Sequence, residues 1–515
     1  MNIETQAIDL EKALAPSLAK FLALGARVCS GEGLAKTHSE VEVILWEEGI
    51  ETLRQLFQDH LDLQSEREQP QDAVAGSDGV ERTHHRVSGR GLETKFGTVR
   101  AGRIAYAARG SKSLHPLDRK LNLPPDLFSF GVRRRVAEEA ARGSHDAVVE
   151  ALKTTTGASV GKRQVEELAV RAAKDFDAFY AGRAEVAGTL PLSGRGSILV
   201  ISVDAKGIVV RHEDLREATK RAAEQEPRDR SKKLKPGEKK NRKRMATAAA
   251  VYIIGQFPRR PEDIVDEMRR RKKAEKRPRP YKKRVWASVE KDAEAVIRQA
   301  FEEAAIRDPG RKKTWVAHVD GNATQIEVLQ RVAKEYGVEL IIVLDVIHAL
   351  GYLWDAAHVS HKVGSQEAQD WVDERFLAIL EGRAGYIAAG MRQSATKSGM
   401  SKEKRKAIDK CAGYLLNHKN FMRYDEYLAA GFPIASGVIE GVCRHLIKDR
   451  MDITGARWSL EGADAVLRLR ALWASGDFEE YWAFHEAQEA ERNHAALFAL
   501  PITPQADQAP EAKAC

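Results

Sequence analysis

Three acidic residues in this chain stand where apolar, fold-forming segments end. Asp204 closes the run SILVISVD, Asp320 closes TWVAHVD, and Glu440 lies in the helix-forming stretch ASGVIEGVCRHLIKDR. Runs of about six β-prone residues are typical of buried strands, so two of the three charges arrive at the edge of a sheet. Because an unpaired buried charge is strongly disfavoured, the pattern predicts that something cationic meets these carboxylates.

The order of strand and helix patterns between residues 196 and 350 indicates an α/β core. We expect a first strand that turns at Ala205–Gly207 into a second strand, IVVRH, and a third strand in MATAAAVYIIGQF. Helix, strand, helix and strand patterns follow in KDAEAVIRQAFEEAAI, TWVAHVD, TQIEVLQRVAKEYG and VELIIVLD. Three antiparallel-capable strands, then helix, strand, helix and strand, are typical of an RNase H-like domain. The predicted fold class is therefore α/β, with an RNase H-like catalytic core whose first part is 196–350.

Helical patterns surround this core. Residues 351–430 are predicted to form an all-α insertion, and residues 431–490 the C-terminal helices of the catalytic core, which carry Glu440. Residues 1–85 are expected to form a helical N-terminal region. The composition of residues 491–515, rich in Pro, Gln and Ala towards the end, predicts a disordered tail.

Residues 86–190 have the patterns of a mainly helical DNA-binding region. From Gly91 to Ala108 the sequence alternates around a Gly-containing turn, which predicts a β-hairpin. From His145 to Val170 two helical patterns flank a turn at Gly157-Ala158-Ser159. This spacing is that of a helix-turn-helix motif, and a plain helical hairpin is the alternative that it leaves open.

In a helix-turn-helix motif the second helix lies in the major groove, and its first side chains face base edges. Those residues would be Lys162, Arg163 and Gln164 in this chain.

Two dense basic segments make nucleic acid the expected partner. Ten of the seventeen residues from Arg228 to Arg244, and eleven of the sixteen from Arg269 to Arg284, are Lys or Arg, in a chain with a net charge of +8. Such blocks bind polyanions by releasing condensed counterions. A solvated loop would explain either basic segment taken alone. Two such segments flanking a single strand candidate favour double-stranded DNA as the partner.

The remaining composition points to a cytoplasmic, nucleoid-associated protein. The cysteines at 29, 411, 443 and 515 form no CxxC pair, so neither a zinc finger nor a disulfide framework is expected. The N-terminal residues MNIETQAIDLEKALAP lack the basic and apolar regions of a signal peptide. No segment reaches the ~20 apolar residues that a membrane span requires, so no membrane partner is expected.

The three acids suggest a site for two Mg²⁺ ions, with Mn²⁺ as a substitute. Phosphodiester transfer by two metal ions requires carboxylates that clamp both ions, and Mg²⁺ prefers oxygen to His or Cys ligands. Asp204 and Asp320, on neighbouring central strands, and Glu440, reaching across from a helix, are the predicted catalytic residues and metal ligands.

Each assignment has an alternative. Asp320 begins DGN, which reads equally as a turn with Asn322 capping the next helix, and Glu440 has the features of an ordinary exposed helix acid. Asp345 also ends an apolar strand and competes for the second metal position. With His348 three residues on, it is assigned here as a supporting pair, in which a carboxylate positions an imidazole.

Basic side chains follow Glu440 at near-helical spacing. Arg444, Lys448, Arg450 and Arg457 are expected to hold DNA phosphates, with Trp458 stacking on a splayed base. The alternative is that Trp458 belongs to the hydrophobic core.

The string ASGVIEGVCRHLIKDRMDITGARWSLEGADAVLRLRALW, together with SVDAKG, HVDGN and LDVIHAL, closely resembles the Kra-type insertion-sequence transposases, bacterial DDE transposases akin to the Mutator-like group. The resemblance covers roughly residues 85–480. It implies an RNase H-like core with an acidic triad, binding to the terminal inverted repeats and to target DNA, and a homo-oligomer on DNA. The triad then falls on Asp204, Asp320 and Glu440, and Ala205 departs from the Gly expected after the first acid.

The sequence therefore predicts a Mg²⁺-dependent DNA transposase that cleaves and joins strands at insertion-sequence ends. Two other functions share its features. A structure-specific nuclease would use the same acids without joining strands, and a repressor would use the helix-turn-helix beside an inactive catalytic domain.

Overall fold

The computed structural model describes residues 10–187, 196–225, 242–271, 273 and 275–499. Its contacts divide the chain into two compact units, one made of Met1–Asp175 with Glu479–Cys515 and the other of Phe176–Phe478. Most of the first basic segment and residues 500–515 of the expected tail lie outside the described residues. The part of that tail before residue 500 is partly helical.

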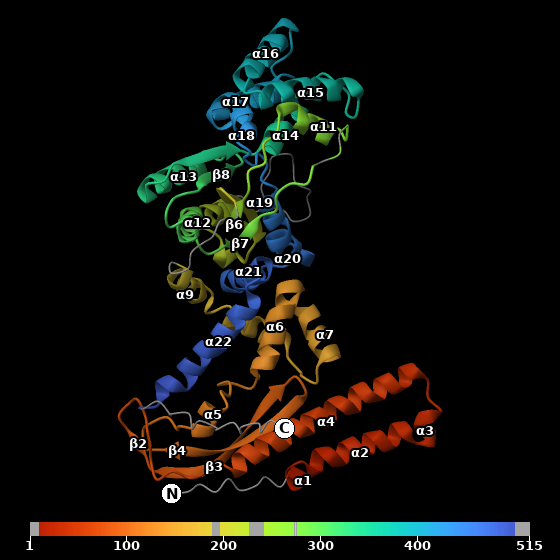
Figure 1. Ribbon diagram of the computed structural model, residues 1–515, viewed down its shortest axis with the longest axis vertical. Helices are drawn as coiled ribbons and strands as arrows, with labels where there is room; N and C mark the ends of the chain where they lie inside the picture. The colour runs from red at the N-terminus through yellow and green to blue at the C-terminus, as the bar shows by residue number, and fades with distance from the viewer. Residues whose placement is uncertain (1–9, 188–195, 226–241, 272, 274, 500–515) are drawn as a thin grey trace, which may run out of the picture. The chain divides into compact units, whose positions relative to one another are not determined.

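Helices and a long hairpin make up the first unit (Figure 1). Its elements are α1 (Leu10–Ala13), α2 (Ala15–Cys29), α3 (Gly31–Leu34), α4 (His38–Glu66), β1 (Val74–Ala75), β2 (Glu81–Arg82), β3 (His84–Thr94), β4 (Gly97–Ala107), α5 (Pro116–Lys120), α6 (Phe130–Arg142), α7 (His145–Thr155), α8 (Lys162–Ala172), all of α22 (Phe478–Asn493) except its first residue, and η5 (Ala495–Leu497).

The predicted β-hairpin is confirmed and is longer than expected. Strands β3 and β4 pair antiparallel from His84↔Ala107 to Thr94↔Gly97. Helix α4 packs along β4. Leu61 of α4 joins Leu92 and Val99 of the hairpin in one buried apolar cluster, so burial of one face of the hairpin fixes its register.

The two helices expected between residues 145 and 170 are also present, as α7 and α8. Ser144 caps α7 by accepting a hydrogen bond from the Ala147 amide. In the turn between the helices, the Gly157 amide donates to the Lys95 carbonyl oxygen at 2.8 Å. A Cβ at Gly157 would lie 2.6 Å from the Phe96 backbone, so only glycine allows this close approach.

The second unit is built on a mixed five-stranded sheet. Its elements are α9 (Phe176–Ala187), β5 (Ile198–Val209), η1 (His212–Asp214), α10 (Glu217–Gln225), β6 (Lys243–Ile254), α11 (Pro261–Met268), β7 (Tyr281–Ser288), α12 (Ala293–Arg307), β8 (Thr314–Val319), α13 (Ala323–Tyr336), β9 (Leu340–Leu344), α14 (Val346–Ala357), α15 (Gln366–Leu380), α16 (Ala384–Lys397), α17 (Lys406–His418), η2 (Lys419–Phe421), α18 (Tyr424–Ala429), α19 (Gly437–Gly441), the π-helix η3 (Val442–Lys448), α20 (Asp449–Met451), η4 (Ile453–Gly455) and α21 (Leu460–Ser475).

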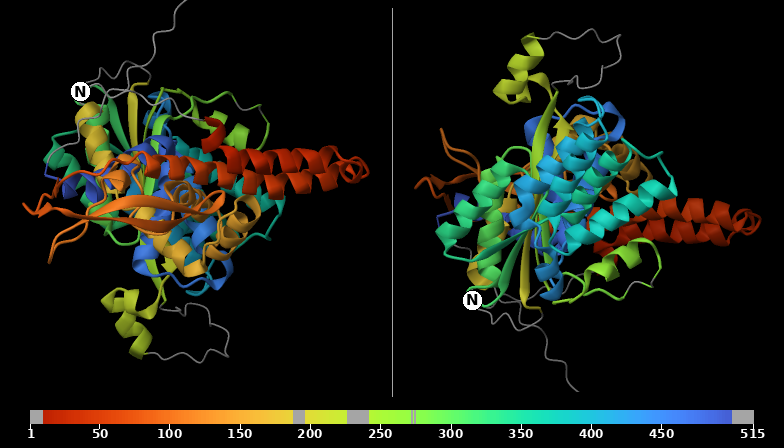
Figure 2. Two further views of the ribbon diagram at one scale, coloured as in Figure 1. Left: turned by 90° about the horizontal axis from the view of Figure 1, so that it is seen from below. Right: turned by 90° about the horizontal axis from the view of Figure 1, so that it is seen from above.

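The strand order in this sheet is β7-β6-β5-β8-β9. Strands β5, β6 and β7 pair antiparallel, whereas β8 and β9 continue the sheet from β5 in parallel. Ala246 to Ile253 of β6 are buried without interruption, so both faces of the sheet are covered. Helices α12 and α13 pack together against it, and α19, η3 and α21 form a second group against the same strands (Figures 1 and 2).

Two strand predictions require correction. The expected hairpin at Ala205–Gly207 is wrong, because β5 runs straight through it and all three residues keep pairing with β6. The third antiparallel strand is instead β7, which the sequence analysis missed. Its first half, Tyr281–Arg284, is basic and largely exposed, and only its second half is apolar and buried, so the charge concealed the strand pattern.

The second basic segment is partly built into the fold. Arg269 donates to the Asp373 carboxylate at 2.8 Å, and Arg284 forms an ion pair with Glu303. Both arginine side chains are mostly buried. The prediction that this whole run is available to DNA is therefore too broad. Only the exposed lysines and arginines between Arg269 and Arg284 remain candidates for contact with DNA.

The region predicted as an all-α insertion, residues 351–430, is helical as expected. It contains most of α14 and all of α15 to α18, which pack against one another and against α11 (Figure 1). In the part of the chain that the structure describes, no helix has both the length and the apolarity needed to cross a bilayer.

Candidate metal centre

Strand register brings three aspartates to one edge of the sheet. The parallel pairing of β5 with β8 ends at Ser202↔His318, and that of β8 with β9 ends at Val319↔Leu344. Asp204, Asp320 and Asp345 each follow these last pairs by one or two residues. The three acids therefore lie where the parallel pairing of three adjacent strands ends, with Asp320 and Asp345 just after β8 and β9 and Asp204 inside β5, which continues to Val209.

Asp345 is fully buried and is held by hydrogen bonds on both carboxylate oxygens. Its Oδ1 accepts from the Ile347 amide at 2.8 Å and thereby caps α14. Its Oδ2 accepts from the Ser436 hydroxyl, which stands four residues before Glu440. The Asp345 amide donates to the Val319 carbonyl at 2.8 Å, so this carboxylate has a fixed position.

A short extended segment then carries Glu440 to the same edge. The Pro433 carbonyl accepts a hydrogen bond from His318 Nε2 at 2.7 Å, and the Ile434 carbonyl accepts from the Val346 amide at 3.1 Å. With the Ser436–Asp345 bond, these contacts fasten residues 433–436 across the ends of β8 and β9. Helix α19 begins immediately after them, at Gly437.

His318, which is buried, makes one of these contacts through its side chain. Since the Pro433 carbonyl can only accept, Nε2 carries the proton, and Nδ1, 3.3 Å from the Ser202 hydroxyl, is the acceptor. Complete burial lowers the pKa of His318, so the ring stays neutral in this tautomer. The histidine was not singled out in the sequence, although its place two residues before Asp320 in a buried strand marks it.

Glu440 lies close to Asp345 and His348. One ligand atom from each of these three residues falls within 4.8 Å of the others, with Asp345 buried and the other two exposed. The predicted set Asp204, Asp320 and Glu440 does not form such a group among the residues described. The structure thus groups Glu440 with the pair that the sequence assigned a supporting role.

Asp204 joins the site through a residue that the sequence analysis did not consider. Its Oδ2 accepts a hydrogen bond from the Cys443 thiol at 3.2 Å, and Oδ1 from the Ala205 amide at 2.6 Å. Burial, and then the Asp204 charge, raise the pKa of the Cys443 thiol, so it remains a proton donor. Cys443 lies three residues after Glu440, at the start of the π-helix η3, and such bulges occur frequently at functional sites.

Asp320 occupies a tight turn. Its Oδ1 accepts from the Asn322 amide at 2.9 Å, and Asn322 caps α13, so the turn interpretation of DGN describes the local structure correctly. Gly321 has φ +99° and lies against the Tyr414 ring and His418. The Tyr414 hydroxyl donates to the Asp320 carbonyl at 2.9 Å. The all-α insertion therefore holds this loop in place, which the sequence did not reveal.

The donors at this edge suit a hard divalent cation. Asp345 and Glu440 supply carboxylate oxygens, the ligands that Mg²⁺ and Mn²⁺ prefer, and Asp204 and Asp320 are carried by neighbouring strands of the same sheet. Within the described residues, none of the four forms an ion pair with lysine or arginine. The imidazole of His348 is the one donor that the expectation of an all-oxygen site did not include.

The basic residues after Glu440 divide into two kinds. Arg444, Lys448 and Arg457 are exposed. Arg450 and Trp458 are buried, and the Arg450 guanidinium lies 4.7 Å from the centre of the Trp458 ring. Burial, and then repulsion from Arg470, lower the pKa of Arg450 to about 10.

The prediction that Arg450 and Trp458 face DNA is therefore corrected: both belong to the core. The indole N–H of Trp458 donates to the Met451 carbonyl at 3.1 Å, and the Trp458 backbone extends the pairing of β5 at Val210. A ring held in this way cannot also stack on a base.

In the first unit, the residues predicted to face base edges lie on an exposed helix start. Lys162, Arg163 and Gln164 form the first turn of α8. Lys162 pairs with Asp146 at 2.6 Å and Arg163 with Glu167 at 3.1 Å, both at the surface. Gln164 accepts from the Gly161 amide at 2.9 Å and so caps the helix. Exposed ion pairs are weak, so both cations remain available to a phosphate.

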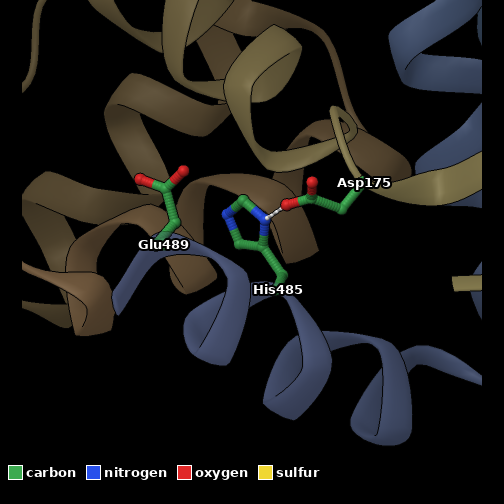
Figure 3. Close-up of side chains that lie close together, drawn as sticks. All are labelled: Asp175, His485 and Glu489. Carbon is green, nitrogen blue, oxygen red and sulfur yellow. Dashed lines mark hydrogen bonds and ion pairs between the residues drawn. The ribbon is translucent and has the colours of Figure 1, made fainter. Parts of the chain in front are cut away.

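A second Asp-His-Glu group lies in the first unit (Figure 3). Asp175, His485 and Glu489 are all buried, and His485 Nδ1 lies 2.7 Å from Asp175 Oδ2. Arg492 donates to both Asp175 oxygens, at 2.7 and 2.8 Å, and Arg133 lies 3.3 Å from Glu489. Two guanidinium groups already neutralise the two acids, so this group is an ion-pair network rather than a metal site.

These geometric findings stand without support from related proteins. No protein-family model matches the chain, and none of the curated proteins compared with it is a significant match.

Proposed function

We propose that this protein is a DNA transposase that cleaves and joins strands with an RNase H-like core. The supporting observation is that Asp345 and Glu440 lie together, beside the strand positions that carry Asp204 and Asp320, and that none of these acids pairs with lysine or arginine among the described residues. Carboxylates that the protein leaves uncompensated favour divalent cations. The strand order β7-β6-β5-β8-β9 with its antiparallel and parallel halves supports the proposed fold.

Each protein group has a role in this proposal that follows from its environment. Asp345, fixed by Ser436 and by its helix-capping bond, orients the site. Glu440 is exposed, so its carboxylate is accessible to a metal ion and to DNA. His348, also exposed, offers an imidazole at the rim, where it can donate a hydrogen bond to a phosphate oxygen.

A divalent ion held by Asp345 and Glu440 would stabilise the negative charge that develops on the phosphate and activate the attacking oxygen, and in this proposal Asp204 and Asp320 would hold a second ion. The Cys443 thiol hydrogen bond keeps one Asp204 oxygen directed toward the helix that carries Glu440. Arg444, Lys448 and Arg457 are exposed cations that follow Glu440 in the sequence and would hold the DNA backbone.

The test uses DNA duplexes from the flanks of the coding region, where the proposal expects inverted repeats. Asp204→Asn should abolish Mg²⁺-dependent strand cleavage and leave binding to these ends nearly unchanged. The matched control is Glu327→Gln, an exposed helix acid of the same unit, and it should cleave normally. If Asp204→Asn still cleaves the DNA in the presence of Mg²⁺, the proposal is wrong.

Products then separate the competing functions. Cleavage followed by joining of the 3′ end to target DNA supports a transposase. Cleavage of branched DNA without joining indicates a structure-specific nuclease, and binding without any metal-dependent product indicates a repressor.

A further inference from the structure

The first unit contains a cavity of about 260 Å³ with a basic lining. The charged and titratable residues in that lining are Arg90, Arg103, Lys112, His115, Asp118 and His494. They come from both strands of the hairpin, from the loop and short helix after it, and from the end of the described chain. None of them belongs to the candidate metal centre.

Asp118 is the one acid among the described residues that line this cavity, and its carboxylate lies close to both arginines. Arg103 Nε lies 2.8 Å from Asp118 Oδ1, and Arg90 Nη1 lies 3.8 Å from Asp118 Oδ2. Lys112 adds a third positive charge at the mouth, where it is exposed. The lining therefore carries a net positive charge when both histidines are neutral.

Among the described residues, three buried atoms of this lining form no hydrogen bond: Nε and Nη1 of Arg103 and Oδ1 of Asp118. Arg103 Nε still lies within ion-pair distance of Asp118 Oδ1, whereas Nη1 of this side chain, which is only 10% exposed, has no partner. A buried, unsatisfied donor on a charged group is costly, and such groups are normally paired. Arg103 therefore lacks an acceptor that a ligand in the cavity would supply.

The neighbouring groups favour an anion as that ligand. Burial lowers the pKa of Arg90, and the charges of Arg103 and Arg133 oppose its ionisation further, while Asp118 and Asp126 offset this in part. Burial and then Arg103 lower the pKa of His115, and burial lowers that of His494. Burial thus disfavours the charged forms of these groups, and an anion bound in the cavity would favour them.

We propose that this cavity binds a phosphate group, either free phosphate or a phosphate of DNA. Guanidinium groups present planar pairs of N–H donors that match phosphate oxygens, and the volume accommodates a tetrahedral anion with part of what it is attached to. The binding site stands independently of the proposed cleavage activity, because no residue of the metal centre takes part in it.

The first measurement is calorimetric titration of the full-length protein with inorganic phosphate at constant ionic strength. We expect saturable binding, weakened about tenfold or more in Arg103→Gln, since a charge-assisted hydrogen bond is lost. Lys112→Gln, an exposed position that leaves the core intact, should weaken binding about threefold. Arg86→Gln, on the same strand as Arg90 but outside the cavity, removes the same charge and should change nothing.

The second measurement identifies the source of the phosphate. A 5′-phosphorylated oligonucleotide that displaces phosphate, where the same oligonucleotide without its 5′-phosphate does not, points to a DNA end. Displacement by both points to a backbone phosphate, and displacement by neither points to free phosphate. The proposal fails if phosphate does not saturate the protein, or if its affinity is the same in wild type, Arg103→Gln and Lys112→Gln. Circular dichroism of each variant checks the fold, and Lys112→Gln decides the outcome should Arg103→Gln not fold.

Discussion

The two Asp-His-Glu groups of this protein have the same residue types and opposite electrostatic settings. Asp175, His485 and Glu489 are buried, and Arg492 and Arg133 meet their carboxylates. Asp345, His348 and Glu440 have two exposed members. None of the three forms an ion pair with lysine or arginine among the residues described.

The same three residue types can therefore form either an ion-pair network or a candidate metal site, so donor geometry alone does not define a metal site. Burying a carboxylate requires compensation, and in the first group the protein supplies it from its own guanidinium groups. In the second group Asp345 receives hydrogen bonds from uncharged donors only, and Glu440 is exposed to solvent, so a bound divalent cation is the natural partner of these charges.

Glu440→Gln should lower the rate of Mg²⁺-dependent DNA cleavage by about 10⁴-fold, because a ligand that acts as part of a catalytic unit is lost. Asp175→Asn, measured at a temperature at which it is folded, should leave the rate within about twofold of wild type. Single-turnover cleavage of end-containing duplexes gives both rates. Equal losses in the two variants would contradict the distinction between the groups.

Asp175→Asn should instead reduce stability by about 2 to 3 kcal/mol, because it leaves the partly buried Arg492 and the buried His485 facing a neutral amide. Urea unfolding followed by a probe in the first unit measures this change. Asp146→Asn is the matched control, since Asp146 makes an exposed pair with Lys162 and its removal should cost at most about 0.5 kcal/mol.

The stability of the same network should depend on pH in the acid range. Burial alone would raise the pKa of Asp175, but hydrogen bonds from His485 and Arg492 outweigh it and lower the pKa to about 2. A depressed pKa stabilises the fold above the unfolded value of about 3.9, and the contribution disappears as pH falls through the folded value. Wild type should therefore lose about 2 kcal/mol relative to Asp175→Asn between pH 5 and about 2. A difference that does not change with pH would refute the assignment.

The smallest effect concerns metal binding itself. Mn²⁺ at about ten times its dissociation constant should stabilise the second unit by about 1.4 kcal/mol, seen as a higher melting temperature. Glu440→Gln should lose this stabilisation and Asp175→Asn should keep it. If Asp175→Asn lost the stabilisation by Mn²⁺ and Glu440→Gln kept it, the buried group would be the one that holds the cation.

Much of this architecture follows from local patterns. The β3–β4 hairpin, the helices α7 and α8, the helical region 351–430, and the apolar strands that contain Asp204 or precede Asp320 are present in the structure because each depends on neighbouring residues. The failures are also local in origin. Ala205–Gly207 has turn composition but continues a strand paired on its full length with β6, and lysines at 282 and 283 concealed the start of β7. Pairing with a distant strand overrides local preference in both cases.

The sequence by itself determined which acids accompany buried strands and which segment carries Glu440. Strand length and apolar alternation depend only on residues that are consecutive in the chain. Only the tertiary structure decided how those charges are compensated. Asp175 meets His485 across 310 positions of the chain, Cys443 reaches Asp204 across 239, and Arg450 with Trp458 turns inward rather than toward DNA. Desolvation and charge pairing depend on residues that are distant in sequence and adjacent in space, so the fold alone distinguishes a self-neutralised network from a site left open to a cation.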